Sequence, residues 1–156
     1  MSTRQTVLRT ALVAVAVVVA DQVTKAIVRG QIARFDEIDL ILGIKFIHTR
    51  NTGVAFSMFS GGGAIVVVIA LVALAALLVF FFSNIHKRLV WLPTGLLIGG
   101  AAGNLIDRAR EGAVTDFVDL PLWPAFNVAD AAITIGVLSL LYVLEGPPSR
   151  GDRRSA

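Results

Sequence analysis

The sequence contains no cysteine and few charged residues. Without cysteine the chain can form no disulfide, no thiolate metal site and no cysteine nucleophile, and it cannot be lipidated on cysteine. Only 16% of the 156 residues are charged and 56% are hydrophobic. A soluble domain usually has about 25% charged and 45–50% apolar residues. So few polar groups cannot cover so apolar a core, and the composition excludes a disordered chain as well. We therefore expect an integral membrane protein.

Net charge and histidine content exclude two further classes. The formal net charge of +3 is too small to indicate binding to nucleic acid. The two histidines, His48 and His86, are not paired, and no spacing typical of metal ligands is present. We therefore expect neither a metal nor a cofactor. The length is that of about one domain.

Long apolar runs predict four membrane-spanning helices. The clearest covers residues 64–82, an unbroken apolar run of 19 residues, close to the ~20 that cross the hydrocarbon core. Further spans are predicted at about 6–28, 89–106 and 125–144. The first of these begins like a cleaved secretory signal peptide. Its later polar residues recur at helical spacing, which favours an uncleaved helix.

Four spans place both termini on one side of the membrane. The basic residues divide equally between the two sides, but those near the termini and the short turn at 83–88 have almost no acidic neighbours. This pattern is typical of the cytoplasmic side. We expect cytoplasmic termini and long outer loops. The basic residues assigned to the cytoplasm are Arg4, Arg9, Lys87, Arg88, Arg150, Arg153 and Arg154.

The outer loops carry patterns of extended chain. In the first loop, apolar residues recur at every second position, which predicts a strand with one apolar face. These residues are Ile38, Leu40, Leu42, Ile44 and Phe46. The alternation in residues 114–119 predicts a second extended segment. We therefore expect a small β-structure on the outer surface, formed mainly by the loop at about 36–60.

Ionisable residues gather at the predicted outer ends of the spans, where such groups tend to mark function. Asp21 and Lys25 are four residues apart on one helix face, with the acid before the base, the order that favours an ion pair. Such a pair would neutralise both charges where the helix end passes through the membrane interface. Asp107 and Arg108 can anchor another helix at the interface, although their side chains point in different directions. The small residues between 99 and 103 permit close helix packing, or a groove for backbone or an acyl chain.

Asp130 is harder to explain as a structural residue. It lies about one turn into an apolar helix, on the same face as Asn127, and a folded-back loop would bring Asp116 against it. Two close carboxyl groups share a proton, so one can act as a base on water while the other donates a hydrogen bond to a carbonyl. That is aspartic peptidase chemistry. A proton- or ion-coupled carrier that uses Asp116 and Asp130, and purely structural polar contacts, remain alternatives at this point.

Five motifs follow one another between about Asp21 and Gly136. They are Asp21-Gln22-x-x-Lys25, Asn51-Thr52-Gly53-Val54-Ala55-Phe56-Ser57, the segment from Gly99 to Arg108, Val114-x-Asp116-Phe117 and Phe126-Asn127-Val128-Ala129-Asp130. In this series they resemble the motifs of bacterial lipoprotein signal peptidases (type II). Any one motif alone would be weak, whereas five in order are highly specific. Val54 departs from the family pattern, which often has a smaller residue there.

The resemblance implies an all-α membrane protein with four transmembrane helices and a small outer β-cradle. It implies an aspartic endopeptidase that removes signal peptides from diacylglyceryl-modified prolipoproteins, cutting before the lipid-bearing cysteine. By motif, Asp116 and Asp130 match the catalytic dyad. The positions matching substrate-binding or supporting residues are Asn51, Gly53, Asn104, Arg108, Asn127, Asp21, Lys25 and Asp107.

Together with the topology and charge pattern, this resemblance predicts the domain, location and partners of the protein. We expect one peptidase domain at 1–146 in the bacterial cytoplasmic (inner) membrane and a disordered cytoplasmic tail at 147–156. The active site is expected near the outer membrane surface. The expected partners are the prolipoprotein substrates and membrane lipid, with no nucleic acid, and we expect a monomer.

Overall fold

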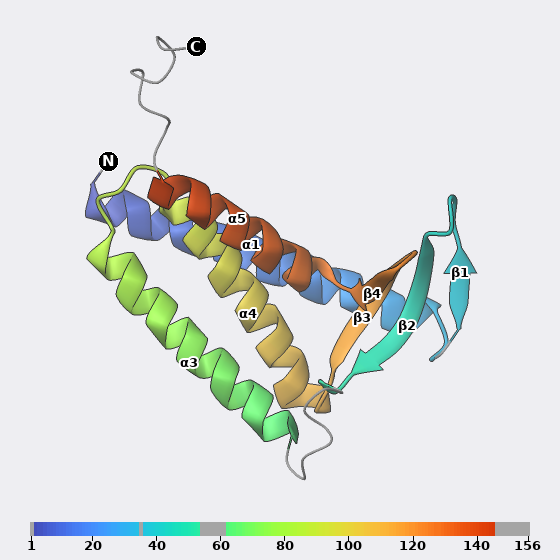
Figure 1. Cartoon of the computed structure of the whole chain (residues 1–156). Helices are drawn as coiled ribbons and strands as arrows, with labels where there is room; N and C mark the ends of the chain where they lie inside the picture. Colours follow the sequence, from blue (N-terminus) through green and yellow to red (C-terminus); the bar gives the residue numbers. More distant parts are fainter. Residues whose placement is uncertain (1, 35, 54–61, 146–156) are drawn as a thin grey trace.

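The structure is a computed structural model that describes residues 2–34, 36–53 and 62–145. It contains helices α1 (Thr3–Gln31), α3 (Gly62–Ser83), α4 (Trp91–Glu111) and α5 (Val128–Glu145). Its strands are β1 (Glu37–Asp39), β2 (Lys45–Asn51), β3 (Val114–Leu120) and β4 (Trp123–Phe126). The sheet lies at the end of the helix bundle opposite the start of α1 and the end of α5 (Figure 1). The predicted fold class, four helices with a small β-structure, is confirmed.

Helix α4 is the central helix of the bundle, and its last turn carries the basic residues Arg108 and Arg110. Within the described residues, the helices long and apolar enough to cross a membrane are α1, α3 and α5. Helix α4 packs against α1, α5 and α3. Its glycines explain the close approach, because a Cβ added to Gly99 would lie 2.7 Å from the Ala14 carbonyl oxygen of α1. A Cβ added to Gly100 would lie 2.5 Å from the Ala129 carbonyl oxygen of α5. The small residues therefore serve close helix packing.

The ends of α4 and α5 differ from the predicted spans at 89–106 and 125–144. Pro93 lies in the first turn of α4, where its missing N–H removes no intrahelical bond. The helix continues to Gly112, whose φ of 71° ends it and whose N–H donates to the Arg108 carbonyl oxygen. Asp107 and Arg108 therefore lie on the helix itself. Helix α5 begins later than predicted because residues 123–126 form β4.

The sheet is antiparallel, in the order β1-β2-β3-β4. The single strand predicted from Ile38 to Phe46 is wrong. The chain turns at Leu42 and Gly43, with φ of 57° and 76°, and returns as β2. Glycine adopts this left-handed conformation without a Cβ penalty. The alternation in the sequence therefore spans two strands and their turn.

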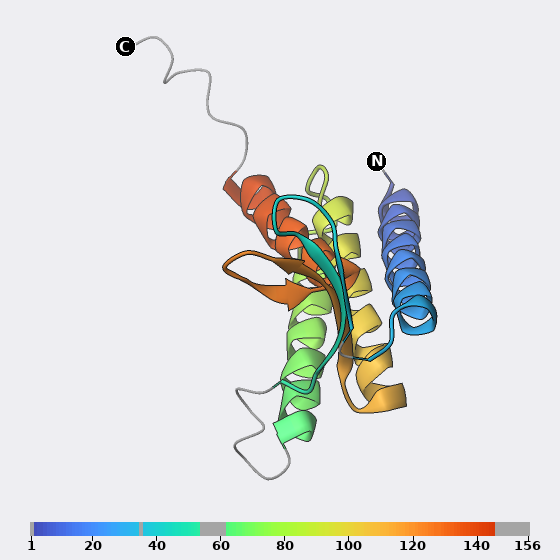
Figure 2. The ribbon, with the colours of Figure 1, turned by 90° about the vertical axis from the view of Figure 1, so that its right-hand side faces the viewer.

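The extended segment predicted at 114–119 is confirmed as β3. Phe117 of β3 packs with Val28 and Ile32 from the end of α1, which fixes β3 against the bundle. Figure 2 shows the sheet in front of that end of the helices. The predicted tail at 147–156, and Val54 with the rest of the predicted loop up to residue 60, lie outside the described residues.

Candidate active site

The polar cluster at the junction of sheet and bundle is built on the first turn of α5. Asn127 Oδ1 accepts a hydrogen bond from the Asp130 backbone N–H at 3.0 Å. In return, Asp130 Oδ2 accepts one from the Asn127 backbone N–H at 3.2 Å. This reciprocal pair is a capping box, and it satisfies two N–H groups that a helix start leaves without partners. Capping therefore holds Asp130 at the helix N-terminus, where the helix dipole stabilises negative charge.

Asp116 approaches the same point from β3. Its Oδ1 accepts a hydrogen bond from Asn127 Nδ2 at 2.7 Å, and its Oδ2 accepts one from Asn51 Nδ2 at 3.0 Å. Asn127 thus contacts both carboxyl groups, Asp116 through its side chain and Asp130 through its backbone. The two acids singled out in the sequence are brought together by a shared partner.

Asp116 is buried, with 2% of its surface exposed. Burial raises the pKa of Asp116 to about 6, and the negative charge of Asp130 also raises it. The hydrogen bonds from Asn51 and Asn127 and the charge of Lys25 act in the opposite direction. A carboxyl group of this kind can hold a proton in mildly acidic conditions and donate it in a hydrogen bond, while a nearby carboxylate accepts one.

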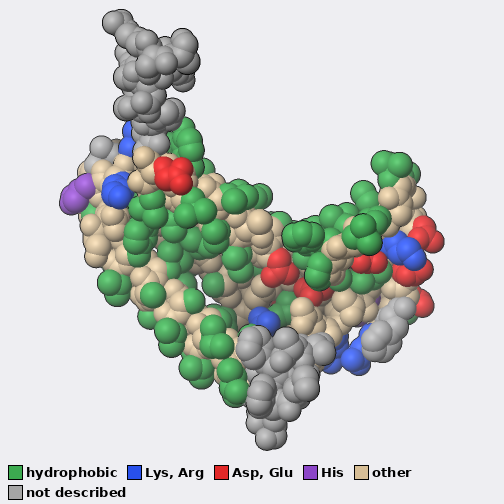
Figure 3. Space-filling view, viewed as in Figure 1, with side chains coloured by type: hydrophobic (Ala, Val, Ile, Leu, Met, Phe, Trp, Pro, Cys, Tyr) green, Lys and Arg blue, Asp and Glu red, His purple; other side chains and the backbone are tan. Residues whose placement is uncertain are grey.

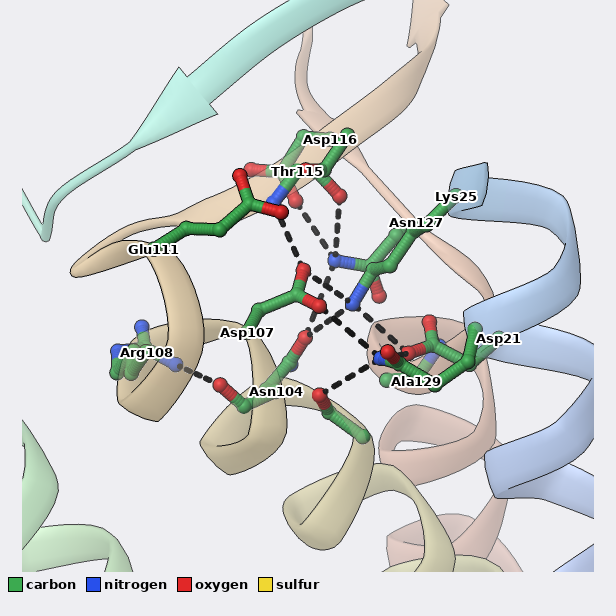
Figure 4. Close-up of polar contacts among 12 residues, drawn as sticks. Asp21, Lys25, Asn104, Asp107, Arg108, Glu111, Thr115, Asp116, Asn127 and Ala129 are labelled. Atoms are coloured by element: carbon green, nitrogen blue, oxygen red, sulfur yellow. Dashed lines mark hydrogen bonds and ion pairs between the residues drawn. The ribbon is translucent and has the colours of Figure 1, made fainter. Parts of the chain in front are cut away.

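Lys25 is fully buried and links α1 to α4. Its ammonium group contacts Asp21 Oδ2 at 2.8 Å and Asp107 Oδ2 at 3.1 Å, and it donates a hydrogen bond to Asn104 Oδ1 at 3.1 Å. These contacts match the three donors of an ammonium group. The expected Asp21–Lys25 ion pair is therefore present, but as part of a larger network (Figure 4).

Lys25 also fixes the orientation of the Asn104 amide. An ammonium group can only donate, so Asn104 turns its oxygen toward Lys25. The Asn104 amide nitrogen then faces Asp130 and donates to Oδ1 at 2.8 Å. The buried ion network thereby presents a hydrogen-bond donor to Asp130.

Asp21 and Asp107 each bind a backbone N–H next to one of the other acids, Asp130 and Asp116 respectively. Asp21 Oδ1 accepts a hydrogen bond from the Ala129 N–H in the first turn of α5, at 3.0 Å. Asp107 Oδ2 accepts one from the N–H of Thr115, the residue before Asp116, at 3.0 Å. Both contacts are buried. The two acids therefore tie the start of α5 and strand β3 to helices α1 and α4.

Gly53 and Arg108 lie at the edge of this cluster. Gly53 has a φ of 79°, and its N–H donates to Asn51 Oδ1 at 2.9 Å, which orients the Asn51 amide toward Asp116. Arg108 donates to the Asn104 carbonyl oxygen at 3.3 Å. Arg108 also lines an apolar groove of about 370 Å³ between α3, α4 and α5. Its described contacts are therefore with α4 and this groove.

Several further residues of the network, including Glu111, were not predicted to have roles. Gln22 donates to Asp107 Oδ1 at 3.0 Å. Arg29 contacts Glu111 at 3.2 Å and donates to the Thr115 hydroxyl at 3.2 Å. Arg29 follows Lys25 by one helical turn, and that spacing could have indicated it. Thr115 contacts Asp107 through its backbone N–H, for which the side-chain pattern gives no signal.

A second cavity borders Asp130. It measures about 310 Å³, and β4 and α5 provide most of its lining. Its lining includes Trp123, Phe126 and Asp130. Apolar space thus borders both Asn104 and Asp130. Within the described ranges, no group of three or more His, Asp or Glu side chains is arranged to hold a metal ion.

Comparisons with known proteins identify relatives over most of the chain. Residues 13–145 match the family model described as signal peptidase (SPase) II. A lipoprotein signal peptidase from Halothermothrix orenii is 35% identical over 142 residues, covering 90% of this chain and 98% of its own. One from Desulforapulum autotrophicum is 39% identical over 153 residues, covering 91% and 94%. A bacterial membrane enzyme solved by the in meso method at 1.9 Å has a TM-score of 0.80 and 35% identity, covering 86% of this chain and 91% of its own. The chain belongs to the signal peptidase II family.

Proposed function

We propose that this protein is an intramembrane aspartic endopeptidase that removes signal peptides from diacylglyceryl-modified prolipoproteins, cleaving directly before the lipid-bearing cysteine. The observation that carries this proposal is the bridge through Asn127, which donates to Asp116 from its side chain and to Asp130 from its backbone. Membership of the signal peptidase II family supports a prolipoprotein as the substrate.

In the proposed reaction the two carboxyl groups share one proton. Asp130, whose oxygens accept hydrogen bonds from Asn104 and Asn127, acts as the base. It takes a proton from water while the water oxygen bonds to the scissile carbonyl carbon. Asp116, protonated, transfers its proton to the carbonyl oxygen, which gives a tetrahedral gem-diol.

The second step reverses these proton transfers. The carbon–nitrogen bond breaks as the leaving nitrogen takes the proton from Asp130. Asp116 regains its proton from a hydroxyl of the gem-diol, which becomes the new carboxyl group. The pair returns to its starting state with one proton, as the raised pKa of Asp116 favours.

The other residues of the cluster position the pair or the substrate in this proposal. Lys25, Asp21 and Asp107 orient Asn104 and hold the backbone beside the two acids. Asn51, supported by Gly53, orients Asp116. The apolar groove beside Arg108 gives a hydrophobic chain of the substrate access to Asn104.

We place the acids at the outer surface of the bacterial inner membrane and both termini in the cytoplasm, with the protein acting as a monomer on lipid-embedded substrate. The start of α1 and the end of α5 lie at one end of the bundle and the sheet at the other, which supports this placement (Figure 1). A carrier would need acids through the membrane depth. Helix α3 contains no ionisable residue, and the acids of the cluster lie where β3 and the start of α5 meet helices α1 and α4, which does not favour a carrier.

Replacing either acid tests the proposal. Asp116→Asn and Asp130→Asn are each expected to lower the cleavage rate of a lipidated precursor at least ~100-fold, because each removes a group that transfers protons. Asp119→Asn is the matched control, since Asp119 lies on the same strand opposite Lys45, away from the cluster. The control should cleave as the wild type does. Full cleavage by both cluster variants would overturn the assignment of the dyad.

A further inference from the structure

Two turns of the sheet expose large apolar side chains next to each other. The β1–β2 turn exposes 72% of Ile41 and 88% of Leu42, and the β3–β4 turn exposes Leu122 fully and 64% of Trp123. A Cβ added to Gly43 would lie 3.1 Å from the ring of Pro121, so the two turns touch. We call residues 40–43 and 121–123 the hairpin tips. Figure 3 shows hydrophobic side chains along this edge of the sheet, across a hollow from the helix bundle.

The backbone of the hairpin tips makes their leucines unusual. Leu42 and Leu122 have φ of 57° and 64°. Turn positions of this kind favour glycine, asparagine or aspartate, which adopt the left-handed region with less strain. Glycine, asparagine and aspartate are also the residues expected at a turn that is exposed to water. Leucine at both positions, in tips that contain no charged residue, indicates an apolar surrounding.

The second tip lies beside a membrane-facing helix. Trp123 and Phe126 line the cavity of about 310 Å³ together with Thr134 and Ile135 of α5. Helix α5 is long and apolar enough to cross the membrane, and 54% of Ile135 is exposed on it. The apolar surface of the tip is thus continuous with the surface that α5 presents to acyl chains. Tryptophan is itself enriched at the boundary between membrane and water.

We propose that the hairpin tips insert into the outer lipid layer of the membrane. The lipid surface would then hold the sheet on the membrane, with β3 and Asp116 beside the start of α5. The first charged residues beyond the β1–β2 tip, Asp39 and Lys45, pair with each other at 3.5 Å at the level expected for lipid headgroups. This inference uses the membrane placement proposed above but not the cleavage reaction.

Tryptophan fluorescence tests the insertion directly, because the chain contains two tryptophans, Trp91 and Trp123. A Trp91→Phe variant in lipid vesicles leaves Trp123 as the reporter. Its emission should lose intensity when the vesicles contain lipids brominated near the carboxyl end of the acyl chain. Bromines near the methyl end should quench it less. Quenching by aqueous acrylamide with none by either brominated lipid would overturn the proposal, whether the tip then faces water or another protein.

A pair of turn variants separates insertion from a general effect on the fold. In the Trp91→Phe background, Leu42→Asn with Leu122→Asn should shift the Trp123 emission to longer wavelength and weaken its quenching by brominated lipid. Leu89→Asn is the control, since Leu89 has a similar φ of 67° but lies in the turn between α3 and α4. It should leave the Trp123 signal unchanged. An unchanged signal in the tip variant would contradict insertion. If brominated lipid quenches Trp123 but the protein cleaves no precursor, insertion of the hairpin tips is supported and only the proposed reaction is refuted.

Discussion

At the scale of single residues, Asn127 has two separable tasks. Its Oδ1 caps α5, and its Nδ2 contacts Asp116. Serine caps a helix about as well as asparagine, but its hydroxyl is shorter and would not reach Asp116. Asn127→Ser should therefore keep the cap of α5 but lower the free energy of unfolding by about 1–3 kcal/mol, because buried oxygens of Asn104, Thr115 and Asp116 lose the Nδ2 donor. It should also lose most of the cleavage. An Asn127→Ser protein that is as active as the wild type would show that the bridge to Asp116 is dispensable.

Asp116 should make the stability of the protein depend on pH. Its pKa is raised from 3.8 to about 6 in the folded protein, so the folded state binds the proton more tightly than the unfolded chain. This contribution is complete below the unfolded pKa and is lost as the pH rises through the folded one. It amounts to at most about 3 kcal/mol, at 1.36 kcal/mol per pKa unit.

Thermal unfolding of detergent-solubilised protein measures this effect. From about pH 4 to 7 the wild type should lose stability relative to Asp116→Asn, whose amide does not titrate. Parallel stability curves for the two proteins would contradict the raised pKa. The same titration of Asp116 predicts that cleavage falls above about pH 6, where the pair loses its one proton.

At the scale of secondary-structure elements, α4 determines how closely the helices approach. A methyl group added at Gly100 would meet the Ala129 backbone, next to the capping box of α5. We expect Gly100→Ala to lower the free energy of unfolding by roughly 1–3 kcal/mol, as overpacked sites do. Gly30→Ala is the matched control in α1, because a Cβ there meets no atom within 4 Å. It should leave stability unchanged or raise it, and equal losses in both variants would argue against close packing at Gly100.

The elements also show which local features the sequence could predict. Apolar runs indicated the helices, because a span must be long and apolar whatever it packs against. The strand from Ile38 to Phe46 was wrong because the period-two pattern continues through the turn at Gly43. The start of α5 was placed too early because residues 123–126 are as apolar as the helix that follows. The observed start of α5 is marked by the capping box of Asn127 and Asp130, and both residues are present in the Phe126–Asp130 motif.

At the scale of the whole molecule, the sheet closes one end of the helix bundle and brings Asp116 to the start of α5. The sequence could predict that Asp116 and Asp130 lie near each other, because both match positions of the motif series, and in the structure both contact Asn127. It could not predict the contacts of Asp21 with Ala129 N–H or of Asp107 with Thr115 N–H. Any residue other than proline offers the same backbone donor, so these contacts leave no mark in the sequence. These backbone contacts form only in the folded protein, where α1, α4 and β3 pack around Lys25.

Cleavage of a matched substrate pair is the most direct test of the proposed reaction. A diacylglyceryl-modified precursor and its unlipidated twin would be incubated with the wild-type protein in lipid, and the product N-terminus read by mass spectrometry. We expect that only the lipidated precursor is cut, with the lipid-bearing cysteine as the new first residue. Equal cleavage of both precursors, or a cut at another bond, would contradict it.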